Sequence, residues 1–593
     1  MSLLSLSLFA AFAAAQPPAV ARSTSAITVV HPAEGELLSG AEGEFVLGSV
    51  SDPDGLFRIN GQTVAVRQNG AYLAWVPVQP GTFTLRCSLT LSDKTTAYYE
   101  RAIFVVPPLS ALPAKPLAID ADSLIPRNNQ ELRPGDWLLA RMHASPGQKA
   151  RFRLKDHPWQ PMRAVNSSLY EGAALVGPGE ELQASPVEFQ LGSGWSSVGA
   201  KSQGLVTLNS AAPAVAVARG QDFVGVKTGP GEGELFHALT GARFLTAGRA
   251  NNETKVALSG GLAGWVETKN LDFLPPGAQP PHAVSDAVSV KAGEGSTTVR
   301  ISLADRVPFT IEEAADLKSL VVRLHYTVSH TNWIIYDAAD PLVDEVRLRQ
   351  EAAELLAVTI RLKPGKTLWG YHASYDGTSV KVELRAPPRL AEAPASPLKG
   401  LRVFLDAGHM PSAPGAIGAL GTREMDVNFQ IAKAVEARLQ GLGAVPILSR
   451  SSGDEEVGLS ERPRLAWEKK ADLFVSIHNN SFPDGTNPFK SAHGYSIFYY
   501  QPRSLELARK VYNAYARLVP IPGEELRFGN LRVLRATEMP AILTESAYLS
   551  LPEQEELLNG SRFRAKLAEA IVEGLRAYLD ELAPPKKARE KAR

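Results

Sequence analysis

A change of residue pattern near residue 400 constrains this fold more than any other feature of the sequence. Before it, strand-length apolar runs are separated by Asn-Gly and Pro-Gly turn signals, which is typical of all-β modules. After it, apolar runs alternate with segments of helical period 3.6, which is typical of an α/β domain. The proline-rich stretch "PPRLAEAPASPLKG", residues 387–400, separates the two patterns. We therefore predict several N-terminal all-β modules followed by a C-terminal α/β domain, with a mostly parallel central sheet flanked by helices.

Two further proline-rich stretches, residues 104–116 and 275–283, divide the β part. Residues 24–107 are predicted to close as a β-sandwich. The stretch "GLAGWVETKNL" resembles the bacterial SH3 family, and the alternation over 284–387 resembles the peptidoglycan-targeting AMIN domains. The expected organisation is a signal peptide (1–15), a β-sandwich module (24–107), a β-rich module (118–212), an SH3-like module (213–275), an AMIN-like module (284–387), an α/β catalytic domain (399–582) and a basic tail (583–593).

The N-terminus and the composition indicate where the protein works. The apolar run "MSLLSLSLFAAFAAAQ" ends in Ala13-Ala14-Ala15, which fits signal-peptidase cleavage near Ala15. This run is shorter than the roughly 20 residues of a membrane span, and no longer apolar run follows. The net charge is zero, so no whole-molecule field attracts nucleic acid. Cys87 is the only cysteine, which excludes an intrachain disulfide. We expect an exported protein of the periplasm or the extracellular wall, with no membrane span and no nucleic-acid partner.

The C-terminal domain carries the expected order of strands and helices. Its predicted helices are "EMDVNFQIAKAVEARLQGLG", "SLELARKVYNAYARL" and "RFRAKLAEAIVEGLRAYLDEL". Its predicted strands are "LRVFLDAG", "AVPILSR", "DLFVSIH", "GYSIFYY", "LRVLRA" and "PAILTES". In an open α/β sheet, chemistry gathers at the carboxyl ends of the strands.

Ionisable residues stand at those strand ends. His409, His478 and Glu545 each end a predicted strand, and Glu424 comes just before the first long helix. Imidazole nitrogens and a carboxylate oxygen suit Zn²⁺, and a catalytic zinc keeps three protein ligands and a water. A further carboxylate can then accept the proton of that water. Taken singly, each histidine could be a hydrogen-bonded surface residue and Glu424 a helix-dipole partner. Together, several buried polar groups call for an explanation, and a metal is a sufficient one.

Three motifs carry a family resemblance. The stretches "LDAGHMPSAPGAIGALGTREMDVNFQIAKAVEARLQGLGAVPILSR", "LSERPRLAWEKKADLFVSIHNNS" and "VLRATEMPAILTESAYLSLPEQEELL" resemble the zinc-dependent N-acetylmuramoyl-L-alanine amidases of the amidase-3 type, over about residues 399–582. The resemblance implies one Zn²⁺ per catalytic domain, held by His409, Glu424 and His478, with Glu545 as the catalytic carboxylate. It also implies supporting roles in the metal's surroundings or at the substrate for Asp406, Asn479, Arg450 and Arg462. Among these, Asp406 is expected to orient His409, and the stretch Asn479 to Ser481 to line the substrate cleft.

The sequence also departs from the family pattern. Ala407 precedes the first Gly-His, Met410 and Pro411 follow it, and Asn479 stands where a small residue is common. These changes alter loops and leave the four metal and acid–base positions intact. The interval from His478 to Glu545 is filled by predicted core elements, so we expect no blocking helix there. His493 is expected to be a solvent-exposed loop residue.

The expected activity is hydrolysis of the amide bond between N-acetylmuramic acid and L-alanine of peptidoglycan by a zinc-activated water. Two alternatives remain open from the sequence: a zinc peptidase that cuts the stem peptide, and a non-catalytic wall-binding scaffold. For the β-modules we expect binding to wall glycan or to a regulatory protein, and a spacer role also stays open.

Overall fold

The computed structural model describes residues 26–38, 42–106, 112–392 and 394–582. The predicted signal peptide and basic tail lie outside these residues. The chain forms two compact units. The first is built mainly from Leu109–Lys366 and Ala373–Glu383, and the second mainly from Ala15–Pro108, Thr367–His372 and Leu384–Arg593. None of the described helices combines the length and the apolar character that a membrane crossing requires.

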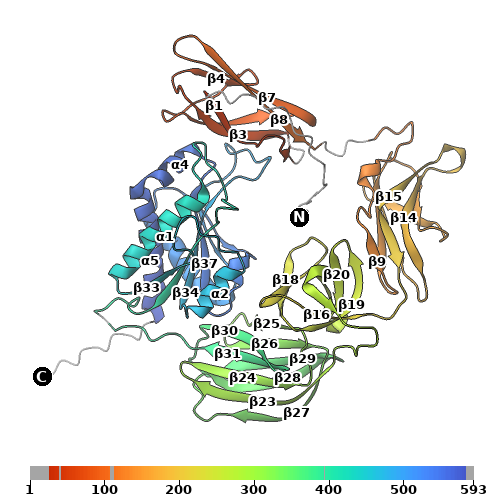
Figure 1. Ribbon diagram of the computed structural model, residues 1–593, viewed down its shortest axis with the longest axis vertical. Helices are drawn as coiled ribbons and strands as arrows, with labels where there is room; N and C mark the ends of the chain where they lie inside the picture. The colour runs from red at the N-terminus through yellow and green to blue at the C-terminus, as the bar shows by residue number, and fades with distance from the viewer. Residues whose placement is uncertain (1–25, 39–41, 107–111, 393, 583–593) are drawn as a thin grey trace. The chain divides into compact units, whose positions relative to one another are not determined.

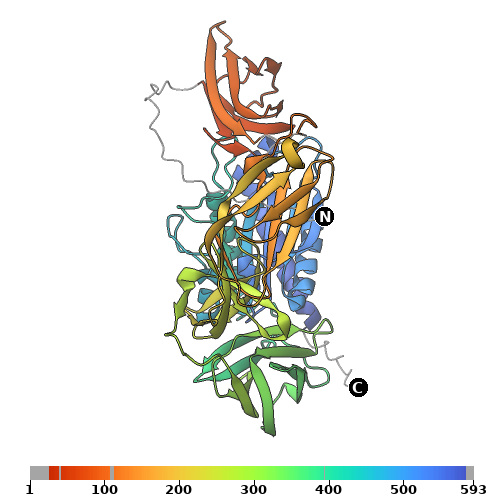
Figure 2. The same ribbon diagram turned by 90° about the vertical axis from the view of Figure 1, so that its right-hand side faces the viewer.

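The second unit begins with a module of two sheets that share one core, here called the N-terminal two-sheet module. Figure 2 shows its strands in red and orange. Alternate residues of its strands, such as Val46, Tyr72 and Leu85, meet in the core. One sheet has the order β1-β3-β6 and the other β2-β8-β7-β4-β5. The strands are β1 (Ile27–His31), β2 (Leu37–Leu38), β3 (Gly43–Val50), β4 (Leu56–Ile59), β5 (Gln62–Thr63), β6 (Ala71–Pro77), β7 (Gly81–Thr90) and β8 (Thr96–Val105).

The first unit consists almost entirely of strands (Figure 1). Its first two predicted modules supply β9 (Gln130–Leu132), β10 (Trp137–His143), β11 (Ala150–Arg153), β12 (Gln160–Ala164), β13 (Leu169–Leu175), β14 (Leu182–Leu191), β15 (Val198–Leu208), β16 (Val215–Ala218), β17 (Phe223–Lys227), β18 (Glu234–Leu239), β19 (Arg243–Ala250), β20 (Glu253–Ala257), β21 (Ala263–Glu267) and β22 (Leu271–Phe273). These strands pair into one continuous sheet, and they enclose two separate apolar cores.

Residues 283–385 form two further sheets. A five-stranded sheet has the order β27-β23-β24-β31-β30, and a four-stranded antiparallel sheet has the order β25-β26-β29-β28. The strands are β23 (Ala283–Gly293), β24 (Ser296–Leu303), β25 (Phe309–Glu313), β26 (Ser319–His325), β27 (Thr327–Tyr336), β28 (Val343–Ala352), β29 (Leu355–Leu362), β30 (Gly370–Asp376) and β31 (Ser379–Arg385). The assignment of these modules to SH3-like and AMIN-like families stays a prediction.

The C-terminal domain is built on a six-stranded mixed sheet of order β33-β32-β34-β37-β35-β36. Neighbouring strands run parallel except β35 and β37, which are antiparallel. The strands are β32 (Arg402–Ala407), β33 (Val445–Leu448), β34 (Leu473–Asn480), β35 (Tyr495–Tyr499), β36 (Gly523–Phe528) and β37 (Ala541–Tyr548). The helices are α1 (Glu424–Gly441), α2 (Glu461–Glu468), α3 (Leu505–Leu518), α4 (Pro552–Asn559) and α5 (Ser561–Leu582).

Helices cover both faces of this sheet. Val435 of α1, Val511 of α3 and Ile571 of α5 pack with strand residues in one large core. On the opposite face, Ala466 of α2 packs with Phe474 of β34 in a smaller core (Figure 1). Burying aliphatic and aromatic side chains of this size contributes about 1.5–3 kcal/mol each. The sheet that carries the ionisable residues is therefore packed between two apolar cores.

Two sequence expectations for this domain are wrong. "LRVLRA" is not a strand: its residues Arg532–Arg535 form a 3-10 turn. Val533 and Leu534 are adjacent and both buried, which suits a helical turn, whereas a strand would place them on opposite faces. The edge strand is instead β36, which the sequence reading missed. In addition, two strands do not end at their ionisable residues: β34 runs past His478 to Asn480, and β37 runs past Glu545 to Tyr548.

Candidate metal centre

Three of the predicted site residues converge. His409, Glu424 and His478 each place one ligand atom within 4.8 Å of the other two. His409 Nε2 lies 2.9 Å from Glu424 Oε2, and His478 Nδ1 lies 3.0 Å from Glu424 Oε1. The side chains of His409 and His478 keep 29% and 14% of their surface exposed. The cluster is therefore held by buried structure and still open to solvent.

Glu424 is the fixed centre of the cluster. It is the first residue of α1, where the helix dipole favours a negative charge. Its carboxylate also accepts hydrogen bonds from the backbone N–H groups of Ala416, at 3.0 Å, and Asn479, at 3.1 Å. Burial raises the pKa of Glu424, but the hydrogen bonds from His409 and His478 outweigh it and hold the pKa well below its ordinary value. Glu424 is thus a carboxylate in its charged form, as a metal ligand must be.

The backbone around His409 is strained. His409 has φ +66°, a left-handed conformation that is uncommon for residues other than glycine and that clusters at functional sites. Its neighbours must be glycine for steric reasons. A Cβ at Gly408 would lie 2.3 Å from the His478 ring, and a Cβ at Gly415 would lie 2.4 Å from Glu424 Oε2. The loop is therefore shaped to bring the two imidazoles onto the carboxylate.

Glu545 lies beside the cluster without joining it. It is paired with His478 in the register between β37 and β34. Its Oε2 atom is buried, and no described residue makes a hydrogen bond with it. Burial raises the pKa of Glu545 well above its ordinary value, and the charge of Glu424 raises it further, while Arg527 opposes both. The direction of this shift favours the protonated form of the carboxyl group, as suits a residue that takes up a proton.

Asp406 and Arg462 support the site in an unexpected way. Asp406 was predicted to orient His409, and the contacts found are indirect: within the described chain, the buried Asp406 accepts a hydrogen bond from Ser476 Oγ at 2.7 Å and pairs with Arg462 Nη1 at 3.4 Å. Arg462 in turn donates from Nη2 to the carbonyl oxygen of His409 at 3.0 Å. Asp406 therefore positions Arg462, and Arg462 in turn holds the backbone carbonyl of His409 and not its imidazole.

Arg450 and Asn479 are structural supports. Arg450 is 1% exposed and donates to the carbonyl oxygens of Met425, at 2.5 Å, and Gly453, at 2.8 Å, which ties the start of α1 to its neighbours. Asn479 is 2% exposed, so the expectation that it lines a substrate cleft is wrong. Its side chain donates to Asn428 Oδ1 at 2.8 Å. Burial of this kind leaves neither residue available to substrate.

Sequence reasoning missed Asn428. This buried residue donates to Glu424 Oε1 at 3.1 Å and lies one helical turn after it. The spacing of four residues was the available signal, because such residues share a helix face. His493 lies in a loop as predicted, but it is half-buried and not solvent-exposed, and its Nδ1 lies 3.1 Å from the carbonyl oxygen of Ser491. The described residues 481–494 contain no helix.

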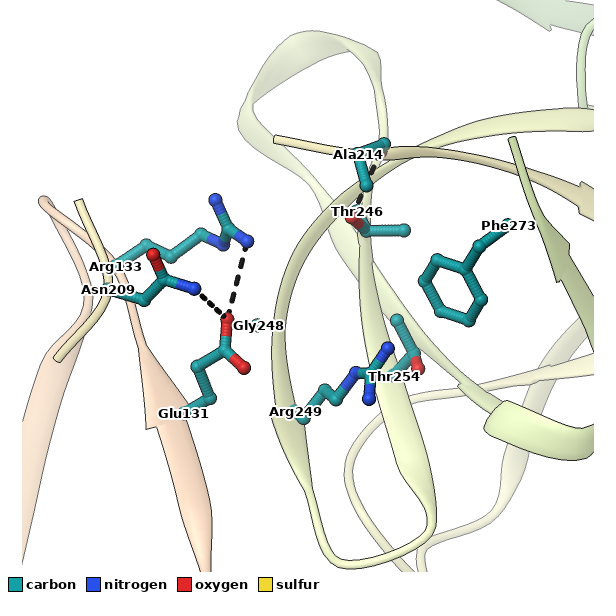
Figure 3. Close-up of a pocket in the computed structure, with 9 residues that line it drawn as sticks. All are labelled: Glu131, Arg133, Asn209, Ala214, Thr246, Gly248, Arg249, Thr254 and Phe273. Carbon is teal, nitrogen blue, oxygen red and sulfur yellow. Dashed lines mark hydrogen bonds and ion pairs between the residues drawn. The ribbon is translucent and has the colours of Figure 1, made fainter. Parts of the chain in front are cut away.

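The first unit contains a separate pocket of about 260 Å³ (Figure 3). Glu131 accepts hydrogen bonds there from Arg133, at 3.3 Å, and from Asn209, at 2.8 Å. The Arg249 guanidinium lies 4.8 Å from the centre of the Phe273 ring. The pocket lining includes no histidine or cysteine. It therefore lacks the donor set of the metal centre, and we do not assign the chemistry to it.

Comparison with known proteins decides the family. Residues 403–577 match the family model of N-acetylmuramoyl-L-alanine amidases, Amidase_3. The chain belongs to this family. The amidase domain is similar to the N-acetylmuramoyl-L-alanine amidase LytC of Bacillus subtilis, with 33% identity over 31% of this chain and 36% of LytC. It is 32% identical to the probable cell wall amidase LytH of Staphylococcus epidermidis, over 31% of this chain and 60% of LytH.

A third relative is matched over most of its length. The uncharacterized protein YqiI of Bacillus subtilis is 30% identical over 32% of this chain and 89% of YqiI. The chain thus spans only 36% of LytC and 60% of LytH. The family match at residues 403–577 contains the three converging residues and Glu545.

Proposed function

We propose that this chain hydrolyses the amide bond between N-acetylmuramic acid and L-alanine in peptidoglycan, as an exported enzyme of the cell wall. One observation carries the proposal: His409, Glu424 and His478 converge, and Glu545, paired with His478 across β34 and β37, has a buried oxygen that makes no hydrogen bond with any described residue. Membership of the amidase family supports the choice of bond.

The residues present fit a zinc ion. Two imidazole nitrogens and one carboxylate oxygen are a donor set of catalytic zinc sites. Their ligand atoms already lie within 4.8 Å of one another, and Glu424 carries its charge. We assign His409, Glu424 and His478 as the ligands of one Zn²⁺. When bound, the ion would supply Lewis-acid polarisation of water and of the scissile carbonyl group.

Glu545 moves the proton in the proposed reaction. Its free Oε2 accepts a proton from the attacking water as the C–O bond forms. Glu545 then delivers that proton to the leaving nitrogen of L-alanine as the C–N bond breaks. The buried environment that raises the pKa of Glu545 makes it a competent base and then a competent acid.

The β-modules of the first unit would bring the enzyme to its insoluble substrate. Strand β27 lies at the edge of its sheet and exposes Trp333 (71%) and Ile335 (60%), which share one face by their spacing. Exposed apolar side chains on an edge strand mark a binding surface. This strip favours wall binding over a spacer role. It supports a targeting role for residues 284–387, which we propose to be an AMIN-like module; that residues 213–275 are an SH3-like module is proposed from the sequence resemblance alone.

One experiment tests the proposal. Purified wall sacculi are digested with the zinc-loaded protein, and the released fragments are analysed by mass spectrometry. We expect peptides with a free L-alanine amino terminus and glycan with intact lactyl acids. Cuts within the stem peptide would identify a peptidase instead, and an absence of release with zinc bound would indicate a wall-binding scaffold.

A further inference from the structure

One sheet of the N-terminal two-sheet module has two apolar faces. In β3 and β6, Val46, Tyr72, Ala74 and Val76 face the core of the module. The alternate residues Phe45, Leu47 and Ala71 are also buried, although they belong to a different cluster. A sheet with one solvated face should show polar residues at these positions. The second apolar face must therefore be covered by another part of the second unit.

The amidase domain covers it. Phe45, Leu47 and Ala71 form a single buried cluster with Ala419, Phe482, Tyr548 and Leu551 of the amidase domain. The Phe45 and Phe482 rings meet edge to face with centroids 6.4 Å apart, and Phe482 and Tyr548 lie at 4.6 Å. The first pair has the edge-to-face geometry that aromatic rings favour, and the rings of the second pair are tilted by 31°.

Polar groups at the edge of this contact between the N-terminal two-sheet module and the amidase domain are also complementary. Glu44 is 1% exposed, and its Oε2 accepts a hydrogen bond from the backbone N–H of Gly485 at 2.7 Å. His31 stacks on Phe45 at 4.2 Å and lies 3.4 Å from Glu44 Oε1. A buried carboxylate is costly unless its oxygens are hydrogen-bonded, and here the amidase domain supplies a donor. The contact with the amidase domain thus explains how a carboxylate can be buried at position 44.

The amidase residues in this contact are neighbours of the site residues in sequence. Phe482 follows His478 by four residues, and Tyr548 follows Glu545 by three. The segments that follow His478 and Glu545 are also hydrogen-bonded to each other. The Phe482 N–H donates to Ser550 Oγ at 3.1 Å, and the Leu549 N–H donates to the Asn480 carbonyl oxygen at 2.8 Å. The N-terminal two-sheet module therefore packs against the two segments that follow His478 and Glu545 in the sequence.

We propose that docking of the N-terminal two-sheet module through its Phe45 face positions these two segments for hydrolysis, so that Phe45 and Leu47 are positioning residues of the enzyme. The inference rests on the proposed amidase function for its effect on rate. The module does not act as a plug, because the side chains of His409 and His478 remain partly exposed with the module docked. It acts through Phe482 and Tyr548 on the surroundings of His478 and Glu545.

The test uses the full-length, zinc-loaded protein with Phe45→Asp, which places a charge in the apolar contact. Tyr98→Asp is the matched control, because Tyr98 is 79% exposed on β8 of the other sheet. Three quantities are measured: amide hydrogen exchange of residues 481–487 and 546–551, the rate of fragment release from sacculi, and bound zinc. We expect exchange in both segments to rise at least tenfold and the release rate to fall at least tenfold in Phe45→Asp. Zinc should stay at one equivalent, and Tyr98→Asp should match the wild type.

An unchanged or increased release rate in Phe45→Asp would overturn the proposal, and so would unchanged exchange in the two segments. Exchange of β7 amides reports whether the module itself stays folded. If it does not, the double variant Phe45→Ser with Leu47→Ser replaces it, since both residues lie outside the module's own core. Failure of the wild type to release fragments would instead refute the amidase function, while the exchange measurements would still decide whether the module is docked.

Discussion

His478 and Glu545 stand opposite each other on the parallel strands β34 and β37. Paired residues of neighbouring strands project from the same face, so a single register places the imidazole and the carboxylate together. A slip of one residue would move Glu545 to the other face of the sheet. The metal ligand and the proton carrier are thus set by the backbone pairing of two central strands.

His478 is proposed to bind the metal, whereas Glu545 is proposed to carry the proton. The variant Glu545→Gln tests whether these two roles are distinct. The amide cannot take a proton from water, so we expect turnover on sacculi to fall by about 10²–10⁴-fold. Bound zinc, measured by elemental analysis, should remain at one equivalent because Glu545 is not among the three converging ligands. Glu553→Gln, at an exposed position of α4, is the control and should behave as the wild type. Retention of normal turnover would exclude Glu545 as the proton carrier.

The sequence predicted the residues of the centre better than the contacts around them. His409, Glu424, His478 and Glu545 could be found because the carboxyl-terminal parts of parallel strands and a helix start converge at one edge of such a sheet. The contact of Arg462 with the His409 carbonyl could not be found, because tertiary packing joins the two residues across a stretch that contains α1 and β33. Asn479 was misplaced because β34 continues past His478 and turns this side chain inward. The apolar outer face of β3 was visible as an unbroken apolar run, but its partner was not.

The buried pair of Asp406 and Arg462 should be essential for stability. Arg462→Ala leaves the Asp406 carboxylate, which is 0% exposed, without its counter-charge. Removing one partner of a buried pair costs about 3–5 kcal/mol. Arg464→Ala on the same helix removes pairs with Glu461 and Glu468 that are partly exposed, and should cost no more than about 1 kcal/mol. Urea unfolding followed by the hydrogen exchange of β34 amides would compare the two, and equal losses would contradict the special role of Arg462.

Acid should weaken the first unit through His325. Burial lowers the pKa of His325 to about 4, below the ordinary value of 6.5. Its folded-state imidazole therefore stays neutral while the unfolded chain binds a proton. The loss of stability begins below about pH 6.5 and is complete near pH 4. Between pH 7 and pH 5 the free energy of unfolding should fall by about 2 kcal/mol from this group.

Native-state hydrogen exchange of β26 amides at both pH values measures this loss. His325→Gln keeps a side-chain acceptor for the Ser259 N–H, which lies 3.2 Å from His325 Nδ1, but does not titrate. The variant should therefore lack the decrease. An equal pH dependence in the variant would assign the effect to other groups.

Trp333 should contribute to wall binding and not to the chemistry. Its exposed ring on β27 offers a flat apolar surface, and Trp333→Ala removes it. We expect the binding free energy to weaken by about 1 kcal/mol, which is about a fivefold rise in the dissociation constant for sacculi in a co-sedimentation assay. Hydrolysis of small soluble muropeptides should be unchanged. Leu235→Ala, at another exposed strand position of the first unit, is the control and should bind normally. Unchanged binding of Trp333→Ala would favour the spacer role.

Gly408 is one of two positions in the metal centre where a side chain would not fit. An alanine Cβ there would lie 2.3 Å from the His478 ring, so the imidazole would have to move away from Glu424. Because the ligands must keep their mutual distances within a few tenths of an ångström, we expect Gly408→Ala to weaken zinc binding by at least tenfold in a competition titration with a chelator. Gly441→Ala is the matched control: it lies at the end of α1, and a Cβ there meets no atom within 4 Å. Zinc affinity equal to the wild type in Gly408→Ala would show that His478 does not need its present position to bind the metal, and the ligand assignment would then have to be revised.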